Sequence, residues 1–363
     1  MKNDYKFSSS TYYLDRTWEY NYKHGPKFDG KFPPFPKAGS WTFLGKKLVS
    51  PLGVAAGPMP NSKWISLYAK LGYGSLIFKT VRSTPHKCHP FPNVVHLNVN
   101  GVKEIKSGKK IVGDLFFPKN TTKLSISNSF GNPCFDIKEW VAEAKKSKRA
   151  IRSGQIFGIS VYGTAEENTK LEQLAADYAK TAKIAKQAKP DFIEINLACP
   201  NVKGSENPNI YKDPIAVSAI TEATKKAIGK TPLVLKVGYY DSYKNLLEVL
   251  KPIKGKFEGI AAINTISRKV TDKNGKQILP GRDESGVCGY AIKDFGVETV
   301  KKLKKAQKDL KMKFEIIGVG GVMTSKDVMD YLKAGANHVQ SATAIMFNPY
   351  LAYELGEYLN PKD

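Results

Sequence analysis

The chain has 363 residues, of which 41% are hydrophobic and 25% are charged. This balance is ordinary for a soluble globular protein and excludes a disordered chain. No apolar run reaches the roughly 18–20 residues that a membrane-spanning helix needs, and the N-terminus lacks the pattern of a secretory signal. Four cysteines are widely scattered along the chain, which argues against a disulfide scaffold, so we expect a cytoplasmic protein.

The net charge is strongly positive. Lys and Arg number 57 against 33 Asp and Glu, which gives +24. Such a charge is typical of nucleic-acid binding, but most of the excess is lysine spread over expected helices, as in residues 301–305. Arginine is scarce and forms no clusters with aromatic residues. We therefore expect a solvated lysine surface that attracts anionic small molecules, and no nucleic-acid partner.

Residues 1–50 form the first segment of the expected organisation. They are rich in Tyr, Phe, Trp, Pro, Gly and Lys, and they show no helical periodicity. So many aromatic residues do not suit a free tail. We expect an irregular N-terminal arm that lies on the body of the protein or on a partner subunit.

From residue 51 short apolar runs alternate with amphipathic stretches, which is typical of repeated βα units around a parallel sheet. Eight runs predict strands: 52–56, 75–79, 155–161, 192–197, 232–237, 259–264, 314–318 and 338–342. Helices are predicted at about 61–72, 136–148, 213–228, 242–252, 295–310, 325–334 and 349–359.

The clearest helix follows the third strand. Thr164 and Glu167 predict a capping box at its start, and Leu171, Leu174 and Tyr178 lie on its apolar face. Eight strands with following helices predict an α/β fold, a (β/α)8 TIM barrel over residues 51–363. A doubly wound sheet is the alternative, but no Gly-x-Gly-x-x-Gly turn follows the first strand.

Two connections are too long for simple βα loops. Residues 80–127 and 268–290 contain turn signals such as Asn100-Gly101 and Pro280-Gly281. We expect insertions over the mouth of the barrel, because loops of this size are usually functional or form interfaces.

Polar residues gather at the predicted strand ends, where barrel enzymes place their active sites. Glycines follow strand seven, and Thr343 follows strand eight, a pattern that suits a phosphate. Two strand-end lysines without matching carboxylates suit a cofactor that gains negative charge on reduction, such as a flavin. Asparagines would pair with a planar, amide-like substrate. The strand-end residues are Lys79, Thr80, Asn196, Lys236, Asn264, Thr265, Gly320, Gly321, Ala342 and Thr343.

Cys199 follows a strand end within Asn196-Leu197-Ala198-Cys199-Pro200-Asn201-Val202. A thiol has a pKa near 8.5 and becomes a useful base if nearby lysines lower it. Cys134 and Cys288 are weaker candidates for a reactive thiol. The short cluster from His86 to His89 is more typical of a loop than of a metal site, so we predict no metal.

Residues 51–350 resemble the dihydroorotate dehydrogenase family, whose members are FMN-dependent barrels. The segment 196–202 is similar to the family's Asn-Leu-Ser-Cys-Pro-Asn-Val, and Asn128-Ser129-Phe130-Gly131 resembles its substrate segment. The resemblance implies oxidation of (S)-dihydroorotate to orotate in pyrimidine biosynthesis, with FMN N5 as hydride acceptor. A cysteine at position 199 is typical of class 1 members and implies the catalytic base.

The resemblance also implies the other site residues. Those implied for FMN are Ala55, Ala56, Gly57, Lys79, Thr80, Asn196, Lys236, Ile263, Gly289, Gly320, Gly321, Ala342 and Thr343. Those implied for the pyrimidine are Lys79, Asn128, Phe130, Gly131, Asn132, Asn196, Asn201, Asn264 and Thr265. A homodimer, and reoxidation by fumarate or through a partner subunit, are implied as well.

The chain departs from the family pattern at two places. Asn93 stands where the family often has Arg, and Asn132 stands where an aliphatic residue usually follows the glycine. The alternative function is therefore an FMN-dependent reaction of another dihydropyrimidine, such as dihydrouracil. A lyase or isomerase that forms a Schiff base at Lys236 or Lys79 is a further alternative.

Overall fold

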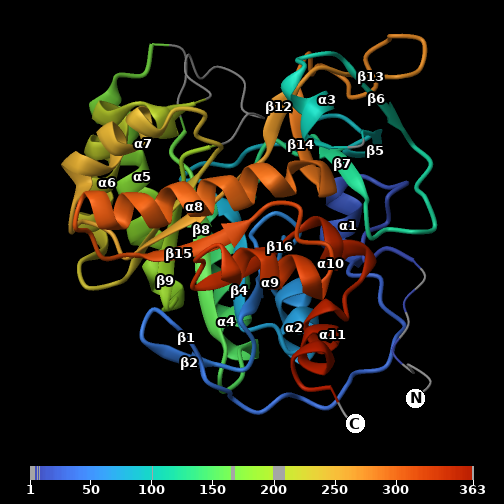
Figure 1. Cartoon of the computed structure of the whole chain (residues 1–363), viewed down its shortest axis with the longest axis horizontal. Helices are drawn as coiled ribbons and strands as arrows, with labels where there is room; N and C mark the ends of the chain where they lie inside the picture. The colour runs from blue at the N-terminus through green and yellow to red at the C-terminus, as the bar shows by residue number, and fades with distance from the viewer. Residues whose placement is uncertain are drawn as a thin grey trace.

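The body of the protein is a closed barrel of eight parallel strands (Figure 1). The computed structural model describes residues 5, 7, 9–99, 101–164, 168–198 and 209–361, so Cys199 and Asn201 lie outside the described residues. The barrel strands are β3 (Leu52–Val54), β4 (Ser75–Val81), β8 (Ile156–Val161), β9 (Phe192–Asn196), β10 (Leu233–Val237), β11 (Gly259–Ala262), β15 (Glu315–Val319) and β16 (His338–Ser341).

These strands follow one another around the barrel in chain order, and β16 closes it by pairing with β3. Most of them are buried along their whole length, which is why they stand out in the sequence as continuous apolar runs. The predicted (β/α)8 barrel and the positions of all eight strands are confirmed.

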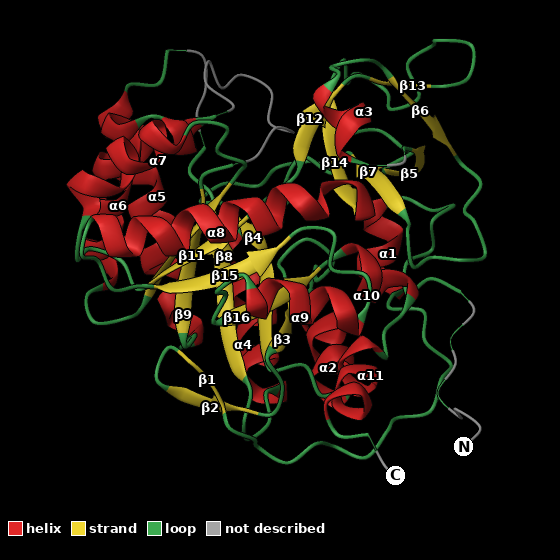
Figure 2. Cartoon of the chain, in the orientation of Figure 1, coloured by secondary structure: helices red, strands yellow, loops and turns green. Residues whose placement is uncertain are grey.

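Helices cover the outside of the barrel (Figure 2). The long helices are α2 (Ser62–Lys70), α4 (Ile137–Ala150), α5 (Leu171–Ala185), α6 (Pro214–Ile228), α7 (Tyr243–Leu250), α8 (Lys293–Asp309), α9 (Ser325–Lys333) and α11 (Leu351–Leu359). The short ones are α3 (Val102–Lys106), α10 (Thr343–Phe347), η1 (Lys186–Ala188), η2 (Ile210–Lys212), η3 (Lys251–Ile253) and η4 (Tyr290–Ile292).

The predicted capping box at Thr164 is wrong, because α5 begins only at Leu171. The backbone N–H of Thr164 donates to Asp177 at 2.8 Å, a residue further along the helix. At the start of the helix Gln173 accepts from the backbone N–H of Lys170 at 2.9 Å. Glu167, the other half of the predicted box, lies outside the described residues.

The two insertions combine into one six-stranded sheet beside the barrel (Figure 2). The first supplies β5 (Val94–Asn98), β6 (Ile111–Asp114) and β7 (Ser125–Asn128), and the second supplies β13 (Val270–Thr271) and β14 (Ser285–Gly289), with β12 (Ile266–Arg268) just before them. Strand β7 joins the two parts, because it pairs antiparallel with β5 on one side and with β14 on the other.

The N-terminal segment is less irregular than its composition indicates. It contains the helix α1 (Trp18–His24), which Thr17 caps, and a hairpin of β1 (Trp41–Phe43) and β2 (Lys46–Leu48). Phe43 is fully buried and stacks on His338, the first residue of β16, with ring centroids 4.7 Å apart. The hairpin therefore covers the N-terminal end of the barrel, opposite the strand ends that carry the polar residues.

His338 is a fully buried imidazole in the floor of the barrel. One ring nitrogen shares a hydrogen bond of 2.7 Å with the hydroxyl of Ser75. Burial lowers the pKa of His338 to about 3, whereas an imidazole in the unfolded chain titrates near 6.5. The folded state therefore holds a neutral ring at neutral pH.

This histidine makes stability fall in acid. A group whose pKa is lowered on folding binds fewer protons in the native state than in the unfolded state. Its contribution to the unfolding free energy is therefore present above about pH 6.5 and is lost as the pH falls toward 3. We expect His338→Gln to reduce the pH dependence of the unfolding free energy by about 1.4 kcal/mol per pH unit within this window. Urea unfolding at pH 7 and pH 5 gives the change of the unfolding free energy with pH. An equal change in the native protein and in His338→Gln would contradict the expectation.

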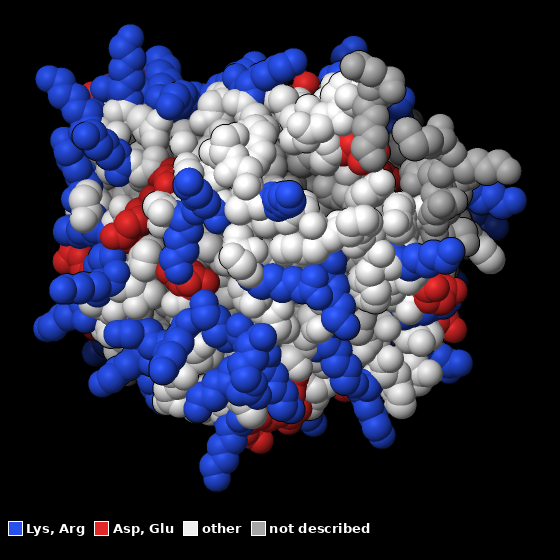
Figure 3. Space-filling view, turned by 90° about the horizontal axis from the view of Figure 1, so that it is seen from below, with Lys and Arg blue, Asp and Glu red and all other residues white. Residues whose placement is uncertain are grey.

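The surface is covered with basic groups. On the face seen in Figure 3, Lys and Arg gather mostly at the left and lower parts, and acidic residues form only small groups. Several surface lysines form ion pairs with Asp or Glu, such as Lys305 with Asp309 at 2.7 Å. Among the helices that the structure describes, none is long and apolar enough to cross a membrane.

Candidate active site

A cavity lies at the C-terminal ends of the barrel strands. Its walls come from β4, β9, β10, β15 and β16, from the segments that directly follow β3 and β11, and from β7 and β14 of the inserted sheet. The C-terminal ends of the strands are where barrel enzymes carry their chemistry. The inserted sheet therefore forms one wall of the site.

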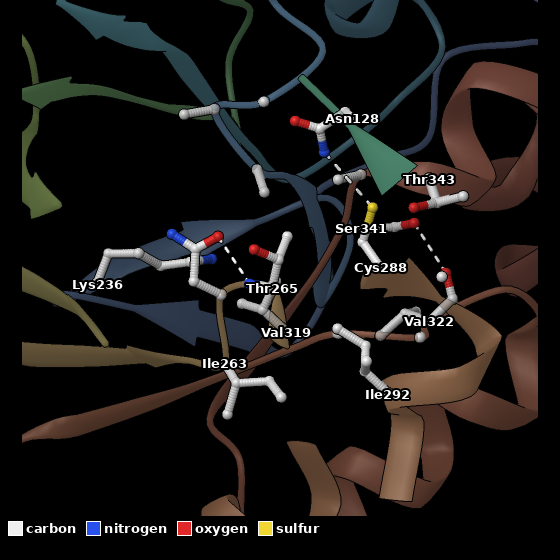
Figure 4. A pocket seen from close by; sticks show the side chains of 18 of the residues that line it. Asn128, Lys236, Ile263, Thr265, Cys288, Ile292, Val319, Val322, Ser341 and Thr343 are labelled. Carbon is white, nitrogen blue, oxygen red and sulfur yellow. Dashed lines mark hydrogen bonds between the residues drawn. The ribbon is translucent and has the colours of Figure 1, made fainter. Parts of the chain in front are cut away.

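The structure brings almost all of the predicted site residues together around this cavity. All thirteen residues implied for the cofactor line it: Ala55, Ala56, Gly57, Lys79, Thr80, Asn196, Lys236, Ile263, Gly289, Gly320, Gly321, Ala342 and Thr343. Of those implied for the substrate, Lys79, Asn128, Asn132, Asn196, Asn264 and Thr265 also line it. Figure 4 shows Lys236 and Thr265 on one side, and Asn128, Cys288 and Thr343 on the other.

Two buried lysines reach the cavity from the strand ends. Lys79 of β4 is 6% exposed and donates to the side-chain oxygen of Asn132 at 3.2 Å. Lys236 of β10 is 7% exposed. Burial lowers the pKa of Lys236, and the carboxylate of Glu194 acts in the opposite direction. The cavity is therefore arranged to receive negative charge.

The carboxamides are held by one another and by the backbone. Asn264 donates to the side-chain oxygen of Asn196 at 3.2 Å, and accepts from the backbone N–H of Thr265 at 2.9 Å. The same oxygen of Asn196 accepts from the backbone N–H of Ala198 at 3.3 Å. These bonds fix the orientation of polar groups that a planar ring with amide-like edges needs. Asn201 and Cys199, which follow directly, lie outside the described residues.

The turn after β15 is built for close approach of the backbone. Gly320 and Gly321 have φ values of +112° and +68°, which side chains rarely adopt. A Cβ at Gly321 would lie 2.6–2.7 Å from the backbone and Cβ of Lys293. The hydroxyl of Tyr331 donates to the carbonyl of Val319 at 3.1 Å and to that of Gly320. Peptide groups here can face a ligand at short range.

The thiols that the structure describes do not have the chemistry of a base at neutral pH. Burial raises the pKa of Cys88 to about 12, and of Cys134 and Cys288 to about 11. Cys288 lines the cavity, but its sulfur donates to the carbonyl of Ile126 at 3.3 Å. These thiols are therefore protonated and poorly nucleophilic.

Phe130 and Gly131 are not among the residues that line the cavity. Phe130 lies beside Tyr12, with ring centroids 6.1 Å apart. Gly131 packs on His89, whose Nε2 would be 2.4 Å from an added Cβ. Asn93 does not line the cavity either; its side chain donates to the carbonyl of Ser129 at 3.1 Å and fastens this loop to the first insertion.

The structure also adds residues that the sequence did not indicate. Besides Cys288, which the sequence indicated as a candidate thiol, the cavity is lined by Glu194, Ile292, Val319, Val322, Met323 and Ser341. Most are apolar residues of strand ends and of the turn after β15, which no chemical pattern marks. Glu194 is different, because a carboxylate within an otherwise apolar strand is a visible signal of a polar interior.

Three comparisons with known proteins each find similarity to dihydroorotate dehydrogenases. The family model for dihydroorotate dehydrogenase matches residues 120–359. A dihydroorotate dehydrogenase of Dictyostelium discoideum is 31% identical over 96% of this chain and 97% of its own length. The catalytic subunit of a dihydroorotate dehydrogenase B (NAD(+)) of Thermoplasma volcanium is 29% identical over 84% of this chain and 86% of its own.

A solved structure supports the fold. The crystal structure of DHODH from Eimeria tenella, in complex with ferulenol, superposes with a TM-score of 0.66 over 90% of this chain and 87% of that chain, at 16% identity. The family model and the Dictyostelium relative identify this chain as a member of the dihydroorotate dehydrogenase family.

Proposed function

We propose that this chain oxidises (S)-dihydroorotate to orotate, with FMN as cofactor and Cys199 as base. The observation that carries the proposal is the convergence of two buried lysines, fixed carboxamides and a glycine turn on one cavity of a family barrel. The relatives of this chain are named as dihydroorotate dehydrogenases, which are oxidoreductases that act on CH–CH donors.

The residues of the cavity fit FMN. The peptide groups of Gly320–Gly321 and Ala342–Thr343, with the hydroxyl of Thr343, would hold the phosphate. Lys236, which lines the cavity, would compensate the negative charge that the flavin gains. The buried hydroxyl of Thr265 has no partner in the described part of the chain, which suits a polar ligand. Bound FMN would accept the hydride from the substrate.

The chain's own residues would orient the substrate and handle its proton. Lys79, placed by Asn132, would face the carboxylate of dihydroorotate. Asn128, Asn196, Asn201 and Asn264 would pair with the polar edges of the ring. Cys199 would take the proton from C5 while the hydride leaves C6. This assignment is supported by the other three cysteines of the chain, whose raised pKa values leave them protonated.

Substrate choice is the experiment that tests the function. The purified protein, loaded with FMN, is assayed with a dye acceptor against dihydroorotate and against dihydrouracil, which lacks the carboxylate. We expect turnover with dihydroorotate at least a hundredfold above that with dihydrouracil, because Lys79 would lose its partner. The reverse preference would replace the proposal by the dihydrouracil-type reaction.

Arg82 offers a second test of the substrate side. It is 1% exposed, and its guanidinium donates to the carbonyls of Gly131 and Asn132, each at 3.2 Å. It also lies over the ring of Tyr162 at 4.9 Å. The guanidinium of Arg82 therefore holds the loop that places Asn132 at the cavity.

We expect Arg82→Lys to raise KM for dihydroorotate about tenfold or more with unchanged FMN content, because an ammonium cannot hold both carbonyls. Steady-state kinetics and the flavin absorbance measure this. The matched control is Arg152→Lys, since Arg152 also lies over an aromatic ring, Phe35, at 4.9 Å, and does not line the cavity. An unchanged KM in Arg82→Lys would show that this loop has no role in binding the substrate.

A further inference from the structure

Glu194 lies at the floor of the cavity, inside the barrel. It is 2% exposed and belongs to β9, where it is in register with Ser160 of β8. Residues two apart in a strand face the same side, so Glu194 lies on the same face as Asn196, one step deeper. Asn196 is in register with Lys236 of β10. The carboxylate is therefore one layer below the lysine.

A chain of polar groups crosses three strands at this level. The hydroxyl of Thr80 donates to that of Ser160 at 3.0 Å, and Ser160 hydrogen bonds to Glu194. The second carboxylate oxygen of Glu194 has no hydrogen-bond partner in the part of the chain that the structure describes. Burial raises the pKa of Glu194, and the charge of Lys236 and the bond from Ser160 lower it.

Lys236 therefore has a carboxylate behind it, and the two groups act on each other electrostatically. Inside a protein the effective dielectric constant is low, so a buried charge acts strongly on its neighbours.

We propose that Glu194 is ionised and is the buried counter-charge of Lys236, and that it sets how strongly the cavity favours reduced over oxidised flavin. The inference rests on the proposed FMN site. Glu194 acts through Lys236 and is a positioning residue. Its negative charge offsets part of the lysine charge that would otherwise stabilise the reduced, negatively charged flavin, so it keeps the potential of the cofactor from rising.

The test is the redox potential of bound FMN in Glu194→Gln, measured by anaerobic spectrophotometric titration with reference dyes. We expect the potential to rise, with binding of reduced relative to oxidised FMN strengthened about tenfold, which is about 30 mV for a two-electron couple. Glu194→Asp keeps the charge and should stay closer to the native potential than to that of the Gln variant.

Glu315→Gln is the matched control. Glu315 is a second carboxylate of the barrel, whose pKa burial raises, but it begins β15 at the opposite end and bonds to the backbone of Leu44 at 2.8 Å. Its variant should leave the potential unchanged. If Glu194→Gln fails to fold, Ser160→Ala withdraws the bond that supports the carboxylate and should shift the potential in the same direction.

An unchanged potential in Glu194→Gln, or in Ser160→Ala where the Gln variant does not fold, would overturn the inference while leaving the proposed function intact. A native protein that binds no FMN would instead overturn the proposed function.

Discussion

Replacing Cys199 by Ala is expected to leave FMN bound and to lower turnover of dihydroorotate roughly 10²–10⁴-fold, the usual contribution of a general base. The cofactor contacts come from other strand ends, so flavin absorbance should be retained. Cys199→Ser should be slow near neutral pH and gain rate as the pH rises, because a hydroxyl is a poorer base than a thiol. Single-turnover reduction of the flavin, followed from pH 6 to 10, measures both variants.

Cys88→Ala is the control for this experiment. Cys88 has a pKa raised to about 12 and does not line the cavity, so its removal should leave turnover nearly unchanged. Full activity in Cys199→Ala would show that another group takes the proton.

Replacing Gly321 by Ala should release the cofactor. An alanine at position 321 would have to adopt a φ near +68°, which side chains disfavour. Its Cβ would also collide with the backbone of Lys293, and a side-chain movement cannot relieve that contact. The turn must then move away from the proposed phosphate position. We expect affinity for FMN to fall tenfold or more, a loss of about 1.4 kcal/mol at least, measured by quenching of flavin fluorescence.

Gly356→Ala is the matched control, because Gly356 lies in α11 and a Cβ there meets nothing within 4 Å. It should keep native FMN affinity and slightly stabilise the helix. Native affinity in Gly321→Ala would place the phosphate elsewhere in the cavity. Thermal unfolding of both variants shows whether the fold itself is retained.

The barrel could be predicted because its physical causes are local. Strands buried on both faces appear as short apolar runs, and the residues after them carry the chemistry, as at Lys79 and Lys236. The strand positions and the residues gathered around the cavity followed from this pattern and from the family resemblance.

Other features depend on long-range pairing, which no local pattern encodes. The pairing of β7 with β14 joins two insertions about 160 residues apart, such as Ser127 with Val287. Helix α5 begins at Leu171, and the backbone N–H of Thr164 donates to Asp177 further along the chain, a contact that the local capping pattern does not encode. Glu194 stands within an apolar run that predicts a strand, and that pattern gives no indication of the residue's place at the cavity.

The measurement that tests the central claim most directly is an absorbance spectrum of the purified, FMN-loaded protein recorded anaerobically before and after addition of dihydroorotate. The proposed function predicts a yellow protein whose flavin absorbance is lost within the mixing time, with formation of orotate. A protein that binds FMN and stays oxidised with dihydroorotate would contradict the assigned substrate, and one that binds no FMN would contradict the site.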